Sequence, residues 1–277
     1  MYVRAVAVLA VLAMFTPDTA SSQGTSTGAA PKTLVVLAAH ADDEVPVAPI
    51  LARYAREGVQ VYLIIATDGF AGAGQQGHIP RPETTVAGED LVRQRAEEAR
   101  CAAQALGIQP PILLGFPDGK LGDYVGDRTL IYRVTQRIAD ELARLRPDAV
   151  ITWGPDGGTG HPDHRLVSNI ATQLQRFGAP GVPERVFYMN LPVEGMRAMN
   201  PPRPEPPLVV PQAKYFTVRV PFTPEDLHAA ERSARCHRSQ ITEEVAERVG
   251  AAMAGAWNGE IPLIPAFQTS PGTDLFR

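Results

Sequence analysis

The stretch TLVVLAAHADDE, residues 33–44, joins an apolar run to a cluster of histidine and carboxylate side chains. Its first seven residues, 33–39, are apolar or β-branched without interruption, which is typical of a strand buried on both faces of a parallel sheet. The polar residues begin where this strand ends. In an open α/β sheet, ligands bind at that edge. The stretch therefore predicts both a fold class and the place of a functional site.

Strand and helix patterns alternate along the chain after this first strand. The expected strands are at 59–66, 112–114, 149–153 and 186–189, and the expected helices are at 47–57, 89–106, 129–145 and 164–177. Such alternation predicts a Rossmann-like, doubly wound α/β fold, in which a mostly parallel sheet carries helices on both faces. No repeat or linker divides the chain, so we expect a single domain.

The C-terminal part departs from this alternation. Residues 200–211 are too rich in proline for a helix or a central strand and predict an extended surface loop. Residues 215–220 alternate like an edge strand, and residues 225–253 show one long helical pattern. The proline-rich tail from Ile261 has no clear period, so no element is predicted there.

The N-terminal residues are expected to lie outside the fold. Behind Arg4, residues 5–15 form an apolar run that is too short to span a hydrocarbon core of ~30 Å as a helix. Small residues at 20–22 offer a cleavage site. We therefore expect a signal peptide over 1–22, a flexible tail over 23–32 and the folded domain over 33–277. The expected protein is secreted or periplasmic, with no stable membrane insertion after cleavage.

Composition excludes several classes of protein. With 44% hydrophobic and 20% charged residues, the chain can bury a sizeable core and is not globally disordered. Its 26 basic and 30 acidic residues give a net charge of −4, without the basic field that a nucleic-acid partner requires. Two cysteines are too few for a cysteine-rich zinc fold. Cys101 and Cys236 are either a disulfide of an exported protein or two buried thiols.

Two polar clusters, AHADDE at 39–44 and GHPDH at 160–164, follow the first and fourth expected strands. In many doubly wound sheets these strands flank the point where strand order reverses, so the clusters can face each other across one crevice. His40 and Asp43 are three residues apart, as are His161 and His164, which lets each pair point at one spot. Imidazole and carboxylate together favour zinc or a similar divalent ion.

The same residue types also serve structural purposes at helix starts. Asp163 after Pro162 can act as a helix cap, and Asp42 and Glu44 can complement the helix dipole. A single cluster would leave these readings equal. Two clusters at strand ends, which hold three of the six histidines, favour a metal site.

Together, the two clusters resemble the motifs of the LmbE-like (PIG-L) family of metal-dependent N-deacetylases. The first motif of this family reads A-H-P-D-D-E, and Ala41 replaces its proline. Further matching residues are Thr67-Asp68-Gly69, Arg95 and Glu98, Gly115-Phe116-Pro117-Asp118-Gly119 and, more weakly, His237-Arg238-Ser239-Gln240.

The resemblance implies one zinc ion per chain, with Fe²⁺ or another divalent metal as an alternative. Its implied ligands are His40, Asp43 and His164. Among the implied catalytic residues, Asp42 is the general base, and His161 stabilises the oxyanion or protonates the leaving amine. Asp163 orients His161 or tunes its pKa.

The implied substrate-binding residues are Arg95, Asp118 and His237. Arg95 and Asp118 match positions that contact the sugar in relatives. His237 either lines the pocket or is a satisfied core histidine, and the sequence does not decide between the two. Loops 69–88 and 200–211 are expected to form the pocket rim.

We therefore expect an exported zinc-dependent hydrolase that removes the N-acetyl group from a small N-acetylglucosamine-containing glycoside. One alternative is a zinc-dependent deacylase or amidase that acts on a non-sugar amide. Another is a non-catalytic carbohydrate-binding relative, because Thr159 stands where some relatives place an oxyanion-donating tyrosine. The sequence indicates neither the aglycone nor the oligomeric state.

Overall fold

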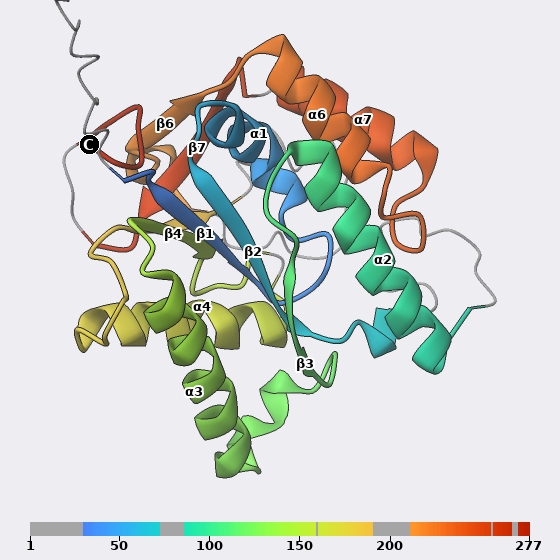
Figure 1. The fold of residues 1–277 in the computed structure, drawn as a ribbon, viewed down its shortest axis with the longest axis vertical. Helices are drawn as coiled ribbons and strands as arrows, with labels where there is room; N and C mark the ends of the chain where they lie inside the picture. Colours follow the sequence, from blue (N-terminus) through green and yellow to red (C-terminus); the bar gives the residue numbers. More distant parts are fainter. Residues whose placement is uncertain (1–29, 73–85, 159, 191–210, 256, 268–270) are drawn as a thin grey trace, which may run out of the picture. The chain divides into compact units, whose positions relative to one another are not determined.

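Strand β1 (Thr33–Ala38) lies in the interior of a seven-stranded sheet with the order β3-β2-β1-β4-β5-β7-β6 in the computed structural model (Figure 1). The structure describes residues 30–72, 86–158, 160–190, 211–255, 257–267 and 271–277. Within it, Pro31–Arg277 form one compact unit. The predicted signal peptide, most of the predicted tail, Thr159 and most of both predicted rim loops lie outside the described residues.

The elements follow the predicted alternation as far as β5. The strands after β1 are β2 (Gln60–Thr67), β3 (Ile112–Phe116), β4 (Ala149–Trp153) and β5 (Val186–Met189). The helices between them are α1 (Ala48–Arg56), α2 (Gly88–Leu106), α3 (Arg128–Leu145) and α4 (Pro162–Arg176), with short 3₁₀ turns η1 (Val45–Val47), η2 (Phe70–Gly72) and η3 (Leu121–Val125).

The strand order reverses at β1. This strand pairs in parallel with β2 on one side and with β4 on the other, so that Leu37 lies opposite both Ile64 and Thr152. The chain continues outward from β2 to β3 and from β4 to β5. This arrangement confirms the doubly wound, mostly parallel fold class, and it places the loops that follow β1 and β4 side by side.

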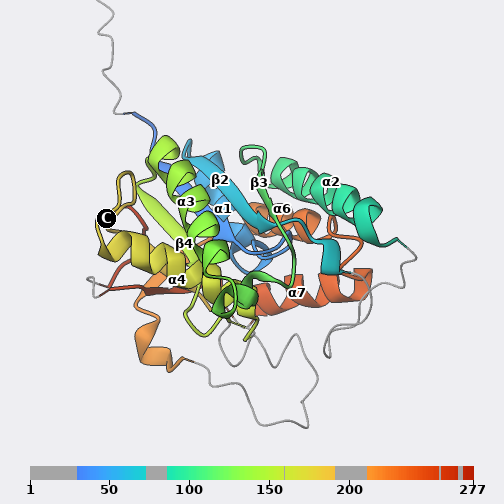
Figure 2. The same cartoon turned by 90° about the horizontal axis from the view of Figure 1, so that it is seen from below.

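Alternate residues of β1 face two separate cores. Leu34 and Val36 belong to the apolar cluster that includes α1, α2 and α6, whereas Val35 and Leu37 belong to the cluster that includes α3 and α4. All four side chains are fully buried. The helices accordingly cover both faces of the sheet, with α3 and α4 on one side and α1, α2 and α6 on the other (Figures 1 and 2). Among the described residues, no helix is both long and apolar enough to cross a membrane.

The C-terminal part differs from the prediction. Instead of one helix over 225–253, α6 (Pro224–Ala234) and α7 (Glu243–Gly255) are separated by the segment 235–242. Thr223 begins α6 with a capping box, and the Thr242 hydroxyl accepts a hydrogen bond from the amide of Val245 at the start of α7. The residues between the helices make buried contacts with α2 and with the loop after β1, described below, which override the local helical pattern.

Two antiparallel strands complete the sheet. The predicted edge strand is β6 (Val218–Pro221), at the end of the sheet. The tail forms β7 (Glu260–Pro265), which the sequence did not predict, and it pairs with both β5 and β6. Pro262 and Pro265 lie within this strand. Because proline removes a ladder donor and argues against a central strand, these residues concealed it.

A disulfide joins Cys101 of α2 to Cys236, just after α6, with the two Cα atoms 5.7 Å apart. The alternative of two free thiols is therefore wrong for this structure. The bond closes a loop across a sequence separation of 135 residues.

We expect the Cys101→Ser/Cys236→Ser variant to lose about 3–5 kcal/mol of unfolding free energy, because the unfolded chain gains the entropy of that loop. Urea unfolding measures the loss. In the presence of reductant, the parent and the variant should unfold together, and equal midpoints under oxidising conditions would contradict the expectation.

Candidate active site

The loops after β1 and β4 bring the two polar clusters into contact. His40 follows β1, and His164 lies in the first turn of α4, yet His40 Nδ1 is 3.0 Å from His164 Nε2. Both residues are buried, with 8% and 6% of their surface exposed. The crevice expected at the reversal of strand order is thus occupied by the expected histidines.

Asp43 completes a set of donor atoms with these two rings. Its Oδ1 is 3.0 Å from His164 Nε2, and its Oδ2 is 3.9 Å from His40 Nδ1. The amides of Ala39 and His40 donate to Oδ2 at 2.8 and 2.9 Å, which fixes the carboxylate. Burial alone would raise the pKa of Asp43, but the adjacent His164 and His40 hold it well below its usual range.

His164 is oriented as a metal-binding imidazole requires. Its Nδ1 lies 2.9 Å from the carbonyl oxygen of Gly157. A carbonyl can only accept, so Nδ1 carries a proton, which leaves Nε2 as the ring nitrogen that would ligate a metal ion. The Trp153 ring stacks on the other side of this imidazole, with 4.9 Å between centroids and 5° between planes. Two imidazoles and a carboxylate fit a divalent ion such as zinc.

His161 adds a further donor near the same point. Ligand atoms of His40, His161 and His164 lie within 4.8 Å of one another. His161 caps α4, and its Nδ1 accepts a hydrogen bond of 3.2 Å from the amide of Asp163. Burial and the neighbouring His40 and His164 lower the pKa of His161 below its usual value. A neutral imidazole with Nδ1 accepting carries its proton on Nε2.

The negative charge of Asp163 raises the pKa of His161 and so opposes the effect of burial, but the Asp163 carboxylate oxygens bind other groups. Its carboxylate accepts hydrogen bonds from the amides of Gly119 and Leu121, at 2.8 and 3.0 Å, and lies 3.3 Å from His40 Nε2. The Asp163 side chain thus reaches the loop after β3, while its backbone amide donates to the His161 ring. Asp163 therefore supports His40 and this loop.

Arg95 and Asp118 also reach the site. Asp118 Oδ1 is 3.0 Å from His40 Nε2, and Asp118 Oδ2 accepts a hydrogen bond of 3.4 Å from Arg95 Nη1. Burial raises the pKa of Asp118, but His40 and Arg95 together hold it below its usual value. Donor atoms of His40, Asp118 and Asp163 form a second group within 4.8 Å.

Asp42 lies beside this cluster and is the more accessible of the paired aspartates, with 24% of its side chain exposed against 5% for Asp43. Burial raises the pKa of Asp42, and Arg95, whose Nη2 is 3.6 Å from Asp42 Oδ1, opposes that rise. Its backbone φ of 106° is a conformation that L residues rarely adopt and that costs of order 1–3 kcal/mol. Strain of this kind often marks a functional position.

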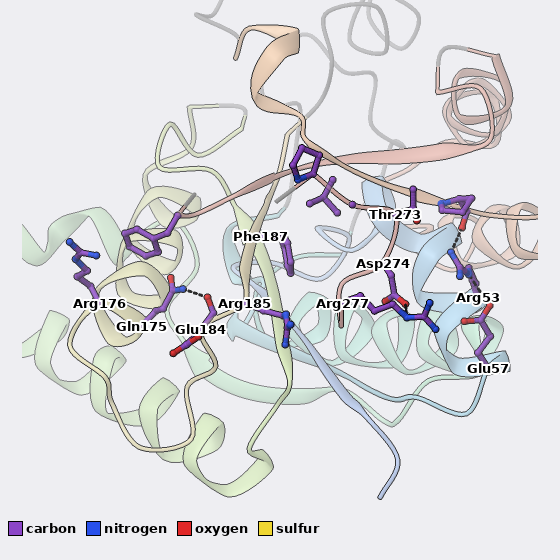
Figure 3. Close-up of a pocket in the computed structure, with 15 residues that line it drawn as sticks. Arg53, Glu57, Gln175, Arg176, Glu184, Arg185, Phe187, Thr273, Asp274 and Arg277 are labelled. Atoms are coloured by element: carbon purple, nitrogen blue, oxygen red, sulfur yellow. Dashed lines mark hydrogen bonds and ion pairs between the residues drawn. The ribbon is translucent and has the colours of Figure 1, made fainter. Parts of the chain in front are cut away.

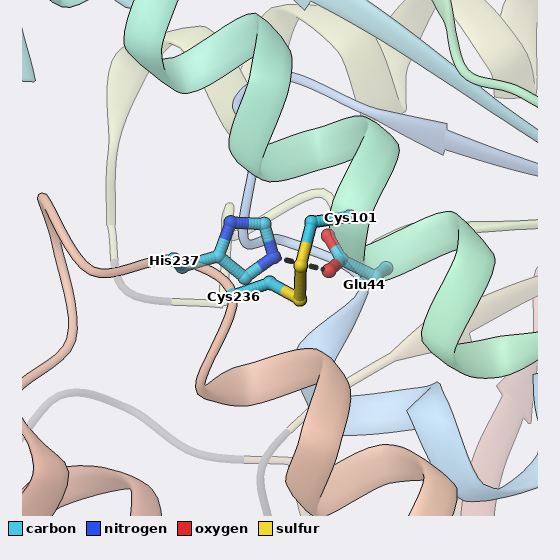
Figure 4. Close-up of a disulfide and its surroundings, with 4 residues drawn as sticks. All are labelled: Glu44, Cys101, Cys236 and His237. Atoms are coloured by element: carbon cyan, nitrogen blue, oxygen red, sulfur yellow. Dashed lines mark hydrogen bonds and ion pairs between the residues drawn. A yellow bond between two sulfur atoms is a disulfide. The ribbon is translucent and has the colours of Figure 1, made fainter.

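His237 is a core histidine, the second of the two readings that the sequence left open. It is fully buried in the turn between α6 and α7 rather than on a long helix. Its Nε2 is 2.6 Å from Oε1 of Glu44, which is also fully buried (Figure 4). The direct substrate contact predicted for His237 has no support here. Sequence reasoning gave Glu44 only a helix-dipole role, and no spacing signal connects residues so far apart.

A separate hollow of about 990 Å³ lies at the opposite, amino edge of the sheet (Figure 3). Its lining includes Arg53 at the end of α1, Arg176 at the end of α4, Arg185 before β5, and Asp274. None of the candidate site residues lines it. This hollow is therefore distinct from the cluster at the carboxyl edge.

The sequence model of the family described as "PIG-L: GlcNAc-PI de-N-acetylase" matches residues 35–175, which make up about half of the chain. The match includes both polar clusters and the strands that carry them. This chain belongs to that family.

Curated relatives carry a common description. A "1D-myo-inositol 2-acetamido-2-deoxy-alpha-D-glucopyranoside deacetylase 2" of Catenulispora acidiphila is 33% identical over 60% of this chain and 58% of its own length. A protein of Kineococcus radiotolerans with the same name, without the number, is 29% identical over 80% of this chain and 72% of its own length. The match to the first of these relatives thus spans less than two thirds of that protein.

Solved structures share the fold at low sequence identity. N,N'-diacetylchitobiose deacetylase from Pyrococcus horikoshii superposes with a TM-score of 0.55 at 20% identity, covering 87% of each chain. The zinc-inhibited form of teicoplanin deacetylase gives 0.59 at 19% identity, covering 86% of this chain and 100% of the other. The 4-carboxy-2-hydroxymuconate hydratase GalB from Pseudomonas putida gives 0.57 at 17% identity, covering 86% and 97%. One fold therefore accommodates more than one reaction.

Proposed function

We propose that this protein is an exported zinc-dependent N-deacetylase that hydrolyses the acetamido group of a small N-acetylglucosaminyl glycoside. One observation carries the proposal: His40, Asp43 and His164 converge within 3.0–3.9 Å of one another, with Asp42 beside them, at the reversal of strand order. Three protein ligands that leave an open position are typical of a catalytic rather than a structural metal site.

The residues around this point divide the work of amide hydrolysis. A divalent ion held by His40, Asp43 and His164 would polarise the amide carbonyl and make nearby water more acidic. Asp42 accepts the proton of the attacking water, because its carboxylate is partly exposed and its pKa is raised chiefly by burial.

His161 is assigned the role of proton donor in this reaction. Because its Nδ1 accepts the hydrogen bond from the amide of Asp163, its Nε2–H is free to donate. We assign this donor to the developing oxyanion and then to the leaving amine, which is a poor leaving group until it is protonated.

We assign Arg95 and Asp118 to substrate binding. Arg95 is buried against both Asp42 and Asp118, so its charge is directed inward and keeps two carboxylates in place. A guanidinium and a carboxylate are suited to the hydroxyl groups of a sugar, which both donate and accept hydrogen bonds.

Family membership and the two curated relatives support the N-acetylglucosaminyl substrate class. The net charge of −4 supports a small molecule over a nucleic acid. The Cys101–Cys236 disulfide supports export, since stable disulfides belong to oxidising compartments. The apolar run at 5–15 supports the same assignment.

A matched substrate panel tests the proposed function. We expect the metal-loaded protein to release equal amounts of acetate and free amine from an N-acetylglucosaminyl glycoside. We expect kcat/KM at least about 10-fold higher than for a simple N-acetyl alkylamine, because binding energy from the sugar contributes to the transition state. Chelator-treated protein is the control. Equal turnover of both compounds would favour the non-sugar amidase, and sugar binding without amine release would favour a carbohydrate-binding relative.

A further inference from the structure

The peptide group between Ala41 and Asp42 is held from both sides by buried charged side chains. Its carbonyl oxygen, on Ala41, accepts a hydrogen bond of 2.6 Å from Arg95 Nη2. Its N–H, on Asp42, donates to Glu44 Oε2 at 3.1 Å. This peptide group leads directly into Asp42, whose φ is 106°. The orientation of the Asp42 carboxylate therefore depends on both contacts.

Glu44 is in turn held by His237. Oε1 of Glu44 is 2.6 Å from His237 Nε2, and neither side chain is exposed. A buried carboxylate requires hydrogen-bonding or charged partners. One oxygen of Glu44 contacts His237, and the other accepts a hydrogen bond from the Asp42 amide. Burial alone would lower the pKa of His237, but Glu44 raises it above its usual value.

The turn that carries His237 is anchored to α2, the helix that also supplies Arg95. Cys236, next to His237, forms the disulfide with Cys101 (Figure 4). Glu98 accepts hydrogen bonds from the Ser239 amide and hydroxyl, at 2.9 and 2.7 Å. Helix α2 therefore supports both contacts with the Ala41–Asp42 peptide, directly through Arg95 and indirectly through the turn that holds His237 against Glu44.

We propose that His237 is a positioning residue: by fixing Glu44, it sets the plane of the Ala41–Asp42 peptide and so directs the Asp42 carboxylate into the active site. The inference rests on the proposed function only for the role of Asp42. His237 then acts on Asp42 through two hydrogen bonds, from His237 to Glu44 and from the Asp42 amide to Glu44, and not by contacting the substrate. The disulfide at Cys236 holds the far end of that chain.

A pair of polar substitutions separates positioning from a general structural role. In His237→Gln, the side-chain amide nitrogen takes the place of Nε2 and still donates to Glu44. In His237→Asn, the side chain is one methylene shorter and does not reach. We expect the Gln variant to keep kcat within about 3-fold, and the Asn variant to lose about 30–100-fold with KM little changed, since a 1 Å displacement of a catalytic group costs about 100-fold.

Two readouts do not depend on turnover. Metal content should equal that of the parent in both variants, because Asp43 is fixed by the amides of Ala39 and His40. Hydrogen exchange at the Asp42 amide should be slow in the parent and in the Gln variant. In the Asn variant it should be at least about 10-fold faster, because the acceptor Glu44 is released.

Equal kcat and equal Asp42 exchange in the Gln and Asn variants would overturn the inference. A parent that shows no deacetylation, together with the expected difference in exchange, would instead overturn the proposed function and leave the positioning role intact. Should both variants fail to fold, the Cys101→Ser/Cys236→Ser variant provides the test. We expect faster Asp42 exchange and a lower kcat at unchanged metal content, and values identical to those of the parent would overturn the inference.

Discussion

Replacing Asp42 with asparagine is expected to lower kcat for deacetylation by about 1,000-fold while leaving metal content unchanged. General-base catalysis contributes about 10²–10⁴-fold, and Asn cannot accept the proton of the attacking water. The proposed ligand set does not include Asp42, whose carboxylate forms an ion pair with Arg95 at 3.6 Å. Steady-state kinetics and metal analysis of the same preparation measure both quantities.

The matched control for this variant is Asp140→Asn on the exposed face of α3. It removes the same charge far from the site, so kcat should stay within about 2-fold, as is usual for surface changes. A loss of metal in Asp42→Asn would show that Asp42 is a ligand. A kcat within 10-fold of the parent would show that another group is the base.

Replacing His164 with alanine is expected to abolish metal retention. The imidazole offers Nε2 at 3.0 Å from both His40 and Asp43, and alanine leaves the remaining two donors without a third. Even outer-shell partners of a metal ligand contribute about 10–100-fold in affinity, so the loss of a direct ligand should exceed 100-fold. Metal analysis after gel filtration, together with a competition titration against a chelator, measures the change.

His228→Ala is the control, because this histidine lies exposed on α6. It should bind metal as the parent does. His161→Ala gives a second contrast, since one ring nitrogen of His161 also lies within the donor group. We expect that variant to keep its metal and lose turnover. Loss of metal from His161→Ala with retention in His164→Ala would reverse the ligand assignment.

The sequence predicts the parallel part of the fold well, because local patterns and topology agree there. The strand at β1 is a continuous apolar run, and the AHADDE cluster begins at its end. The end of the strand therefore predicts the position of the site. The C-terminal part is less readable. The prolines in β7 argue against a strand, so no strand was predicted there. The break between α6 and α7 depends on contacts with α2 that no local sequence pattern contains.

Within the site, sequence reasoning brings the right residues together but not all of their contacts. Residue type, spacing and strand ends bring the pairs His40/Asp43 and His161/His164 to one point, and only the family resemblance selects His40, Asp43 and His164 as the expected ligands. The carboxylate of Asp163 turns to Gly119 and Leu121, in a loop more than 40 positions away, rather than to its neighbour His161. Glu44 and His237 are separated by 193 positions. Such pairings depend on how distant loops pack, which spacing does not encode.

Metal-dependent deacetylation is tested most directly by titrating the metal-free protein with Zn²⁺ and measuring bound metal and deacetylation of an N-acetylglucosaminyl glycoside on the same samples. We expect activity to rise in proportion to bound metal until about one ion per chain is bound, as three ligands with an open position require. Full activity without metal would contradict it, and so would no amine release at any occupancy.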